Sequence, residues 1–293
     1  MNGRLPAWLT KRVSSPATVA EVERMVRSAQ LHTVCESARC PNLGECWSRR
    51  TATFMILGDI CTRNCGFCAI KVGKPNPPDL NEPERVAQTA RSMGLRHVVV
   101  TSVTRDDLPD KGAGHFAATI RYLHQLMPSA GVEVLTPDFA GRADLIDIVV
   151  QEKPDIFNHN IETVDRLTLT VRPQGRYQRS LDVLRTVRQL NPDLVTKSGL
   201  MVGLGEERAE VIQTLEDLRA AQVEIVTIGQ YLRPTMRHLP VVEYIHPDRF
   251  EEYAEAARSI GFRHVSSSPF TRSSYHAEQF SPRVRPALAS RSD

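Results

Sequence analysis

The stretch TFMILGDICTRNCGFC, residues 53–68, sets three cysteines immediately behind a short apolar run. The run from Thr53 to Leu57 has the apolar, β-branched composition of a buried strand. Cys61, Cys65 and Cys68 follow it with the spacing C-x3-C-x2-C. A strand that delivers a group of thiols at its carboxyl end indicates an α/β fold with its chemistry at that end.

The same alternation of a short β-branched run and a longer amphipathic segment continues along the chain. The predicted strands are 53–57, 97–102, 132–135, 155–158, 195–202, 224–228 and 263–267. The predicted helices are 83–93, 114–126, 142–150, 180–190, 207–221 and 248–260, with another at 19–29 ahead of the repeat. Each strand but the last is followed by a helix, which requires parallel pairing through right-handed crossovers.

Such a repeat forms either a barrel or a doubly wound sheet, and the glycines decide little between them, whereas the placement of polar residues favours the barrel. Gly203-Leu204-Gly205 begins like a dinucleotide-binding fingerprint, but Arg208 stands at the third glycine position. Polar residues gather behind several strands, where α/β barrels build their active sites. We therefore predict an α/β fold, a partial (β/α)6-type TIM barrel over residues 51–268, with N- and C-terminal extensions (1–50 and 269–293) closing the barrel mouth.

An upstream group, Cys35, Cys40 and Cys46 in C-x4-C-x5-C, completes the six cysteines of the chain. Three sulfurs per group suit iron–sulfur clusters better than closed tetrahedral zinc, which usually takes four nitrogen or sulfur ligands. Each cluster would then keep one iron open to another ligand. Two other interpretations stay open: three disulfides, and a structural zinc completed at the first group by His32.

The composition is that of an enzyme that works in water. Charged residues make up 24% and hydrophobic residues 41% of the chain, and the mean hydropathy is −0.29. We expect no membrane span, because no uninterrupted apolar run is long enough. The net charge of +3, from 37 basic and 34 acidic residues, gives no reason to expect nucleic acid but leaves an acidic protein partner open. We expect a cytoplasmic enzyme, because no signal sequence is visible and open clusters are oxygen-sensitive, and we expect the basic tail 283–291 to be solvated.

Several of these segments together carry a family resemblance. The C-x3-C-x2-C group behind the first strand, with Phe67 before its last cysteine, resembles the radical S-adenosylmethionine (SAM) enzymes. The upstream group, the segments 101–108 and 157–164, and the terminal motif RSSY at 272–275 resemble the lipoyl synthase family. They cover about residues 30–276, and their combination is far more specific than any one motif.

The resemblance implies insertion of two sulfur atoms at C6 and C8 of an octanoyl chain carried by a protein. In that family, one 4Fe–4S cluster binds SAM and is held by Cys61, Cys65 and Cys68, and an auxiliary 4Fe–4S cluster gives up its sulfur and is held by Cys35, Cys40 and Cys46. A serine of the terminal motif supplies the fourth auxiliary ligand, and we prefer Ser274 to Ser273. A hydroxyl ligand suits a consumable cluster, because an alkoxide fits iron in a sulfide cluster less well than a thiolate does.

The resemblance also implies partners and further site residues. The carrier is the lipoyl domain of a dehydrogenase E2 or the glycine-cleavage H protein, and the electron donor is a flavodoxin or ferredoxin. Arg272 is expected to act beside Ser274. Around SAM we expect Asn160 and Glu162 behind the fourth strand, together with Thr101 and with Lys197, which either points into the barrel or snorkels at the surface.

Three other points bear on the site. We interpret His159 as a hydrogen-bonded structural residue and the pair 106–107 as partners that order the loop around Arg105. The alternative function is another radical SAM sulfur-inserting enzyme, one resembling biotin synthase. A pure electron carrier is disfavoured, because ferredoxins complete four-cysteine ligation whereas each group here has three cysteines.

Overall fold

The computed structural model describes residues 5–10, 16–37, 40–48, 52–275, 277–280 and 283. The predicted domain boundary near residue 50 and all of the basic tail except Arg283 lie outside these residues. The boundaries at 50 and 268 therefore stay predictions, although the last strand does end at Ser268.

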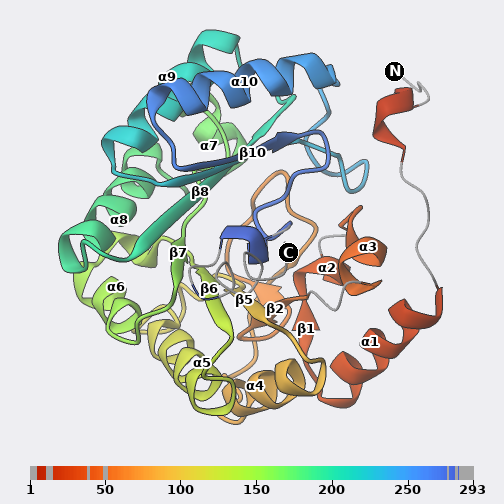
Figure 1. Ribbon diagram of the computed structural model, residues 1–293, viewed down its shortest axis with the longest axis vertical. Coiled ribbons are helices and arrows are strands. Elements are labelled where there is room, and N and C mark those ends of the chain that lie inside the picture. Colours follow the sequence, from red (N-terminus) through yellow and green to blue (C-terminus); the bar gives the residue numbers. More distant parts are fainter. Residues whose placement is uncertain are drawn as a thin grey trace, which may run out of the picture.

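Eight strands of the described chain form one sheet, in the order β1-β2-β5-β6-β7-β8-β9-β10. Their bounds are β1 His32–Thr33, β2 Thr53–Ile56, β5 His97–Ser102, β6 Gly131–Leu135, β7 Ile156–Asn158, β8 Val195–Val202, β9 Ile225–Gln230 and β10 His264–Ser268. All neighbours from β2 to β10 pair in parallel, and β1 is added antiparallel to β2. The edge strands β1 and β10 do not pair with each other within the described residues, so the sheet curls into an open barrel (Figure 1).

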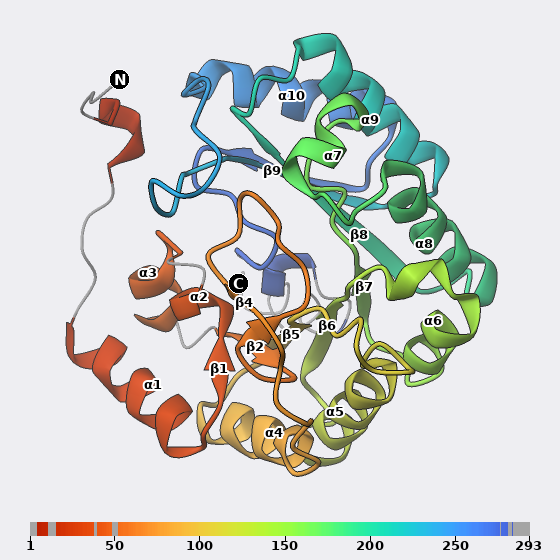
Figure 2. The same cartoon turned by 180° about the vertical axis from the view of Figure 1, so that it is seen from behind.

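Helices form a ring outside the curled sheet (Figures 1 and 2). The ring contains α4 Glu82–Ser92, α5 Ala113–Leu126, α6 Ala143–Val150, α8 Tyr177–Leu190, α9 Arg208–Ala220 and α10 Pro247–Ile260, while α1 Pro16–Ser28 and the short α2 Val34–Ser37, α3 Leu43–Ser48 and α7 Thr168–Val171 lie outside the regular repeat. Local signals fix several helix ends. A reciprocal capping box between Glu207 and Glu210 opens α9, and α10 begins at Pro247 and ends before Gly261, whose φ of 101° suits glycine.

The strands are buried on both faces, as expected for a parallel sheet covered by helices. Every residue of β2, β7 and β9 is buried. Apolar side chains of the strands and helices form two large core clusters, one around β2 to β7 and one around β8 to β10.

The C-terminal segment runs through the barrel from one end to the other, in the centre of the ring in Figures 1 and 2. At the carboxyl ends of the strands, the carbonyl of Pro269 accepts the N–H of Gln230 (3.3 Å). Phe280 packs on the first residues of β7, β8 and β9, and Arg283 binds Asp155, which precedes β7 (2.7 Å). The extension therefore fills the interior of the barrel in addition to lining its mouth.

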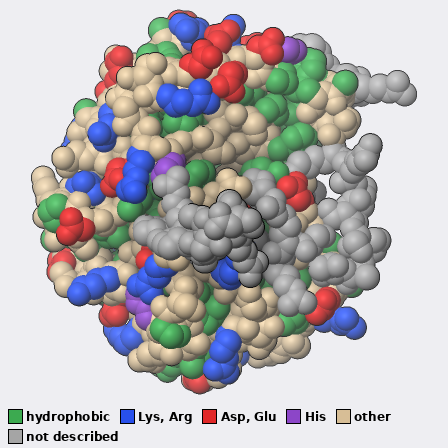
Figure 3. Space-filling view, in the orientation of Figure 1, with side chains coloured by type: hydrophobic (Ala, Val, Ile, Leu, Met, Phe, Trp, Pro, Cys, Tyr) green, Lys and Arg blue, Asp and Glu red, His purple; other side chains and the backbone are tan. Residues whose placement is uncertain are grey.

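The predicted repeat is confirmed: all seven strands and six following helices are present, with ends shifted by a few residues. The elements missed are too short to show a period, namely β1, α2, α3, α7 and the two-residue strands β3 Ile60–Cys61 and β4 Lys71–Val72. Within the described residues each helix is too short or too polar to cross a bilayer. Basic and acidic side chains are interspersed on the face seen in Figure 3.

Candidate active site

A cavity of about 490 Å³ lies at the carboxyl ends of the strands. Its wall includes segments behind β5, β6 and β7, at 101–104, 135–137 and 159–160. It also includes five of the six cysteines and both motif serines, which are Cys35, Cys40, Cys61, Cys65, Cys68, Ser273 and Ser274. Both cysteine groups and the terminal motif therefore meet around one space.

The second cysteine group lies on a loop that backbone hydrogen bonds hold in place. The sulfur of Cys61 accepts the backbone N–H groups of Arg63 (3.4 Å) and Thr104 (3.3 Å). Further along the loop, Gly66 donates its N–H to the carbonyl of Val171 (2.9 Å). Hydrogen bonds to sulfur are one means by which a protein sets the reduction potential of an iron–sulfur cluster.

The cysteines have the chemistry that iron requires. All six lie in the described residues and all six are free, which contradicts the three-disulfide interpretation. Burial raises the pKa of Cys35 and of Cys65 to about 11 and that of Cys68 to about 12. These groups are therefore neutral thiols in the metal-free chain, and a bound metal would displace their protons and gain soft sulfur ligands.

The geometry gives little support to a structural zinc. His32, the residue that might complete a Cys3His set, lines a different cavity together with Asp59. Among the described residues, no three His, Cys, Asp or Glu side chains are close enough to share one metal ion. A cluster does not need such closeness, because each cysteine binds a different iron.

Two hydrogen bonds join the first cysteine group to the terminal motif. The side-chain amide of Asn42 donates to the carbonyl of Phe270 (2.7 Å), and the hydroxyl of Tyr275 donates to Glu45 (2.8 Å). Residues 42 and 45 lie between Cys40 and Cys46, and residues 270 and 275 flank the two serines. The loop of the first group and the motif are therefore held together on both sides of Ser274.

The two serines of the motif have different surroundings. The hydroxyl of Ser273 donates to the side-chain oxygen of Asn160 (3.0 Å) and accepts from its side-chain amide (2.8 Å). Gly229 allows the motif to lie this close to the sheet, because a Cβ at that position would lie 2.1 Å from the carbonyl oxygen of Thr271. Ser274 also lines the cavity. Burial lowers the pKa of Arg272, and the nearby Cys40 opposes this change.

Glu162 and Arg172 bring opposite charges to the cavity wall. Glu162 has a left-handed φ of 70°, which is costly for a residue other than glycine, and its backbone is pinned to β8 by bonds to Gly199 (3.0 Å) and Met201 (2.8 Å). Burial raises the pKa of the Glu162 carboxyl, and the charge of Arg172 opposes this rise. A strained acidic residue beside a buried arginine is typical of a binding site.

The remaining predicted SAM residues fall in two places. Thr101 lines the cavity, and its hydroxyl donates to the carbonyl of Leu135 (2.8 Å). Of the two positions expected for Lys197, the barrel interior is the one observed, but the residue does not line the cavity. Its ammonium is fully buried against Glu133 (2.9 Å) and lies 5.5 Å from the centre of the Phe280 ring.

The prediction for His159 is confirmed. Its ring bonds the carbonyl of Thr136 (2.9 Å) and the hydroxyl of Ser180 (3.1 Å), and burial lowers its pKa to about 4. The prediction for the acidic pair is right for one residue only. Asp107 pairs with Arg105 (2.9 Å), whereas Asp106 reaches a residue of the cysteine loop.

Sequence reasoning missed two arginines at the cavity. Arg172 bonds the hydroxyl of Ser180 (3.3 Å) and the carbonyl of Asn160 (3.3 Å). Arg63 lies between Cys61 and Cys65, and that position was the only available signal. A basic side chain inside a metal-binding loop predicts a nearby carboxylate.

Comparisons with known proteins agree with this geometry. The Radical SAM superfamily profile matches residues 55–218. The lipoyl synthase of Rubrobacter xylanophilus is 55% identical over 287 residues, 98% of this chain and 89% of that protein. The lipoyl synthase of Caldanaerobacter subterraneus is 55% identical over 278 residues, 95% of this chain and 97% of that protein.

Solved structures share the fold at low sequence identity. SuiB of Streptococcus suis bound to S-adenosylmethionine has a TM-score of 0.58 and 11% identity, with 77% of this chain and 52% of that chain covered. Methylornithine synthase (PylB) has a TM-score of 0.54 and 11% identity, with 95% and 88% covered.

Proposed function

This chain belongs to the lipoyl synthase family of the radical SAM superfamily, and from that premise we propose how its residues divide the reaction. The reaction inserts two sulfur atoms at C6 and C8 of a protein-bound octanoyl chain, with two 4Fe–4S clusters and SAM as cofactors. Relatives with 55% identity over nearly the whole chain are lipoyl synthases, which favours this reaction over the alternative resembling biotin synthase.

We assign the SAM-binding cluster to Cys61, Cys65 and Cys68. When bound, this cluster and SAM supply a radical that can remove hydrogen from unactivated carbon, which no side-chain base can do because such hydrogens lack useful acidity. The residues of this chain provide placement and exclusion of water. The backbone N–H groups on the Cys61 sulfur and the burial of Cys65 and Cys68 support this role.

We assign recognition of SAM to the wall behind β5 and β7. SAM carries a carboxylate, an ammonium and ribose hydroxyls, and the wall offers Arg172 for the first and Glu162 for the others. Asn160 and Thr101 add polar groups beside them. Lys197 stays a predicted contributor to SAM binding. Because it bonds Glu133, we propose that it contributes indirectly, by shaping the barrel interior.

We assign the auxiliary cluster to Cys35, Cys40 and Cys46 with Ser274 as the fourth ligand. This cluster is a substrate of the reaction, because its sulfur enters the product. The bond between Ser273 and Asn160 supports the choice of Ser274, because it occupies the hydroxyl of Ser273 in both directions. Arg272 lies on the same cavity wall as Cys40 and offers its charge to the anionic cluster.

The finer identity of the partners rests on the same premise. We propose that the octanoyl chain arrives on a dehydrogenase E2 lipoyl domain or a glycine-cleavage H protein, and that a flavodoxin or ferredoxin supplies electrons. We also propose that the enzyme works in the cytoplasm, because six free thiols suit a reducing compartment.

The observation that carries the proposal is the meeting of both cysteine groups with Ser274 around one cavity of about 490 Å³. The test is to incubate the anaerobically reconstituted chain with SAM, reductant and an octanoylated carrier peptide. We expect the peptide to gain the mass of two sulfur atoms less the hydrogens they replace. If SAM is cleaved but the peptide gains no sulfur, the proposed reaction is wrong.

A further inference from the structure

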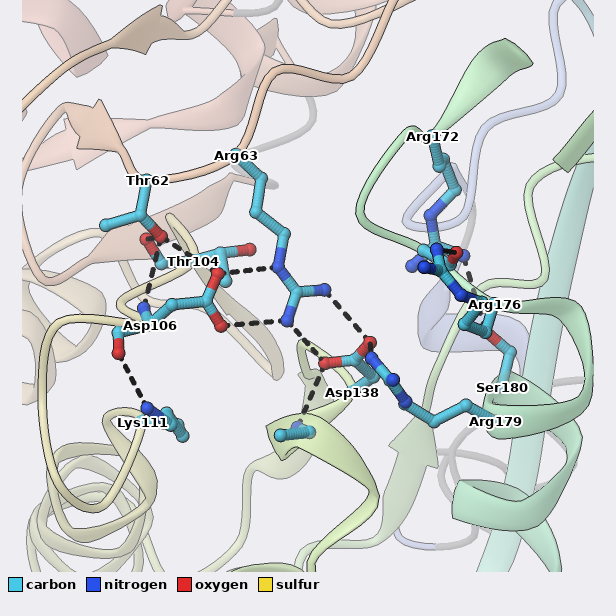
Figure 4. Close-up of polar contacts among 12 residues, drawn as sticks. Thr62, Arg63, Thr104, Asp106, Lys111, Asp138, Arg172, Arg176, Arg179 and Ser180 are labelled. Atoms are coloured by element: carbon cyan, nitrogen blue, oxygen red, sulfur yellow. Dashed lines mark hydrogen bonds and ion pairs between the residues drawn. The ribbon is translucent and has the colours of Figure 1, made fainter. Parts of the chain in front are cut away.

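One side chain in the C-x3-C loop ties that loop to two others (Figure 4). Arg63 donates its Nε and Nη2 groups to the two carboxylate oxygens of Asp106 (2.7 and 2.8 Å). It donates Nη1 and Nη2 to those of Asp138 (2.9 and 2.8 Å). Asp106 follows β5 and Asp138 follows β6, so one guanidinium joins three loops.

This ion cluster is deeply placed. The side chain of Arg63 is 8% exposed and that of Asp138 is 1% exposed. Burial alone would raise the pKa of Asp138, but the hydrogen bonds and charge of Arg63 hold it well below the usual range. A doubly bidentate arginine is rigid, because its planar fork matches both carboxylates at once.

Both carboxylates have further hydrogen-bond partners. Asp138 accepts the N–H of Ala140 (3.1 Å) and a bond from Arg179 (3.3 Å). The hydroxyl of Thr62 donates to Asp106 (3.2 Å) and accepts the backbone N–H of the same residue (3.1 Å). These contacts and those of Arg63 form one frame, in which two adjacent residues of the C-x3-C loop, Thr62 and Arg63, both hold Asp106.

The frame also determines the surroundings of the Cys61 sulfur. Its two N–H donors belong to Arg63 itself and to Thr104, which lies two residues before Asp106. The bond from Arg63 to Asp106 draws these two segments together. Thr62 also donates its backbone N–H (3.1 Å) and its hydroxyl (3.0 Å) to the carbonyl of Thr104, so opening the Arg63 bond would loosen both donors and leave Thr62 alone to hold the Thr104 segment.

We propose that Arg63, clamped by Asp106 and Asp138, is a positioning residue that holds the C-x3-C loop in its iron-binding shape before iron arrives and keeps both N–H donors on Cys61. The inference rests on the proposed assignment of the SAM-binding cluster to Cys61, Cys65 and Cys68. It adds a residue whose guanidinium is held by Asp106 and Asp138.

The test uses the full chain with Cys35→Ala, Cys40→Ala and Cys46→Ala, so that only the second group takes iron. In this background the main variant is Arg63→Met with Asp138→Asn, which removes one positive and one negative charge together. It keeps the net charge and removes the deeply buried carboxylate together with its partner, so that the only carboxylate of the clamp left without Arg63 is Asp106, which is 36% exposed. The matched control is Asp107→Asn, because Asp107 lies in the same loop but pairs with Arg105.

The readouts are the rate of iron uptake, the reduction potential of the cluster and the change in its electron paramagnetic resonance spectrum when SAM is added. We expect the main variant to fold, to take up iron roughly tenfold more slowly and to have a lower potential, because N–H groups on sulfur favour the reduced, more negative cluster. Arg63→Lys keeps the charge without the fork and should fall between the main variant and the background. Asp107→Asn should match the background.

The outcomes separate two failures. If the background chain itself takes up no iron, the assignment of the second group is wrong. If the background takes up about four irons and the main variant matches it in rate, potential and response to SAM, the clamp is wrong and the assignment stands. If the main variant does not fold, Arg63→Lys decides: the same rate and potential as the background would overturn the proposal.

Discussion

The two cysteine groups share a cavity but are built in different ways. The second group lies on one loop, which the bidentate ion pairs of the buried Arg63 join to the loops behind β5 and β6. The first group lies beside the terminal motif, which comes from a distant part of the chain. Single hydrogen bonds hold the two together, from Asn42 to Phe270 and from Tyr275 to Glu45, over 228 and 230 residues.

The difference matches what each cluster does in this family. The SAM-binding cluster serves every turnover, so its loop gains from a rigid frame. The auxiliary cluster is a substrate and must come apart. The proposed oxygen ligand from a separate segment would give it an iron that leaves readily.

The largest effect should follow from removing the second group. With Cys61, Cys65 and Cys68 all replaced by alanine, we expect SAM cleavage to be abolished and the iron content to fall from about eight to about four per chain. Iron analysis and detection of 5′-deoxyadenosine measure the two effects. Retained cleavage would mean that the two groups have been assigned the wrong way round.

Removing Ser274 should separate the two activities. We expect Ser274→Ala to keep SAM cleavage while sulfur insertion is lost, because the clamp and the second group are untouched. Ser273→Ala is the matched control and should keep part of the insertion, since Ser273 acts through Asn160. Loss of insertion in Ser273→Ala with full insertion in Ser274→Ala would exchange the roles of the two serines.

The sequence predicted the local features of the molecule but not the contacts between distant parts of the chain. The strands, the helices and the six cysteines were predictable, because periodicity and spacing are local properties. The clamp was not, because nothing near Arg63 shows that Asp106 and Asp138 face it across two strands. The choice between the serines likewise depends on Asn160, which is 113 residues from Ser273 in the chain.

The path of the C-terminal segment was also beyond the sequence. Arg272 to Tyr275 could be recognised as a motif, but its continuation through the barrel is fixed by contacts of Phe280 with the first residues of three strands. The same holds for Lys197. Its position in a strand was predictable, but its partner Glu133 comes from the neighbour but one in the sheet.

A substitution at Gly229 in the sheet should impair the iron loading of the first group only. At Gly229 an alanine Cβ would lie 2.1 Å from the carbonyl oxygen of Thr271, so the terminal segment must shift. Backbone displacement of this kind costs about 1–3 kcal/mol. We expect Gly229→Ala to load the second group fully and the first poorly, so iron should fall toward about four per chain with SAM cleavage kept. Equal loss from both groups would show that they are not built independently.

Substitution of Lys197 tests whether the barrel interior contributes to SAM binding. We expect Lys197→Met to lower the free energy of unfolding by about 3–5 kcal/mol, because Glu133 is left buried without its charge partner. Adding Glu133→Gln should restore most of that stability. Loss of SAM cleavage in the stable double variant would give Lys197 a direct role in cofactor binding, and normal cleavage would make it structural.

The same pair predicts a dependence on pH. Burial raises the pKa of Glu133, but Lys197 and His97 together lower it by a larger amount, so the net shift of this pKa in the folded chain is downward. A lowered pKa adds stability above the ordinary pKa of a glutamate, and this is lost as the pH falls through the folded value. Acid unfolding should therefore be shallower in the double variant than in the unsubstituted chain.

The smallest effect should come from one hydrogen bond of the first group. Tyr275→Phe removes the bond to Glu45, worth about 0.5–1.5 kcal/mol, and so should speed loss of auxiliary iron to a chelator by up to about tenfold. The control is Tyr177→Phe, which removes a bond of equal length (2.8 Å) to Asp217, between α8 and α9. Both variants should lose similar stability, but only Tyr275→Phe should release iron faster, and only from the first group. Faster release in both, or from both groups, would mean that iron retention follows overall stability and that the attachment of the terminal segment has no special part in it.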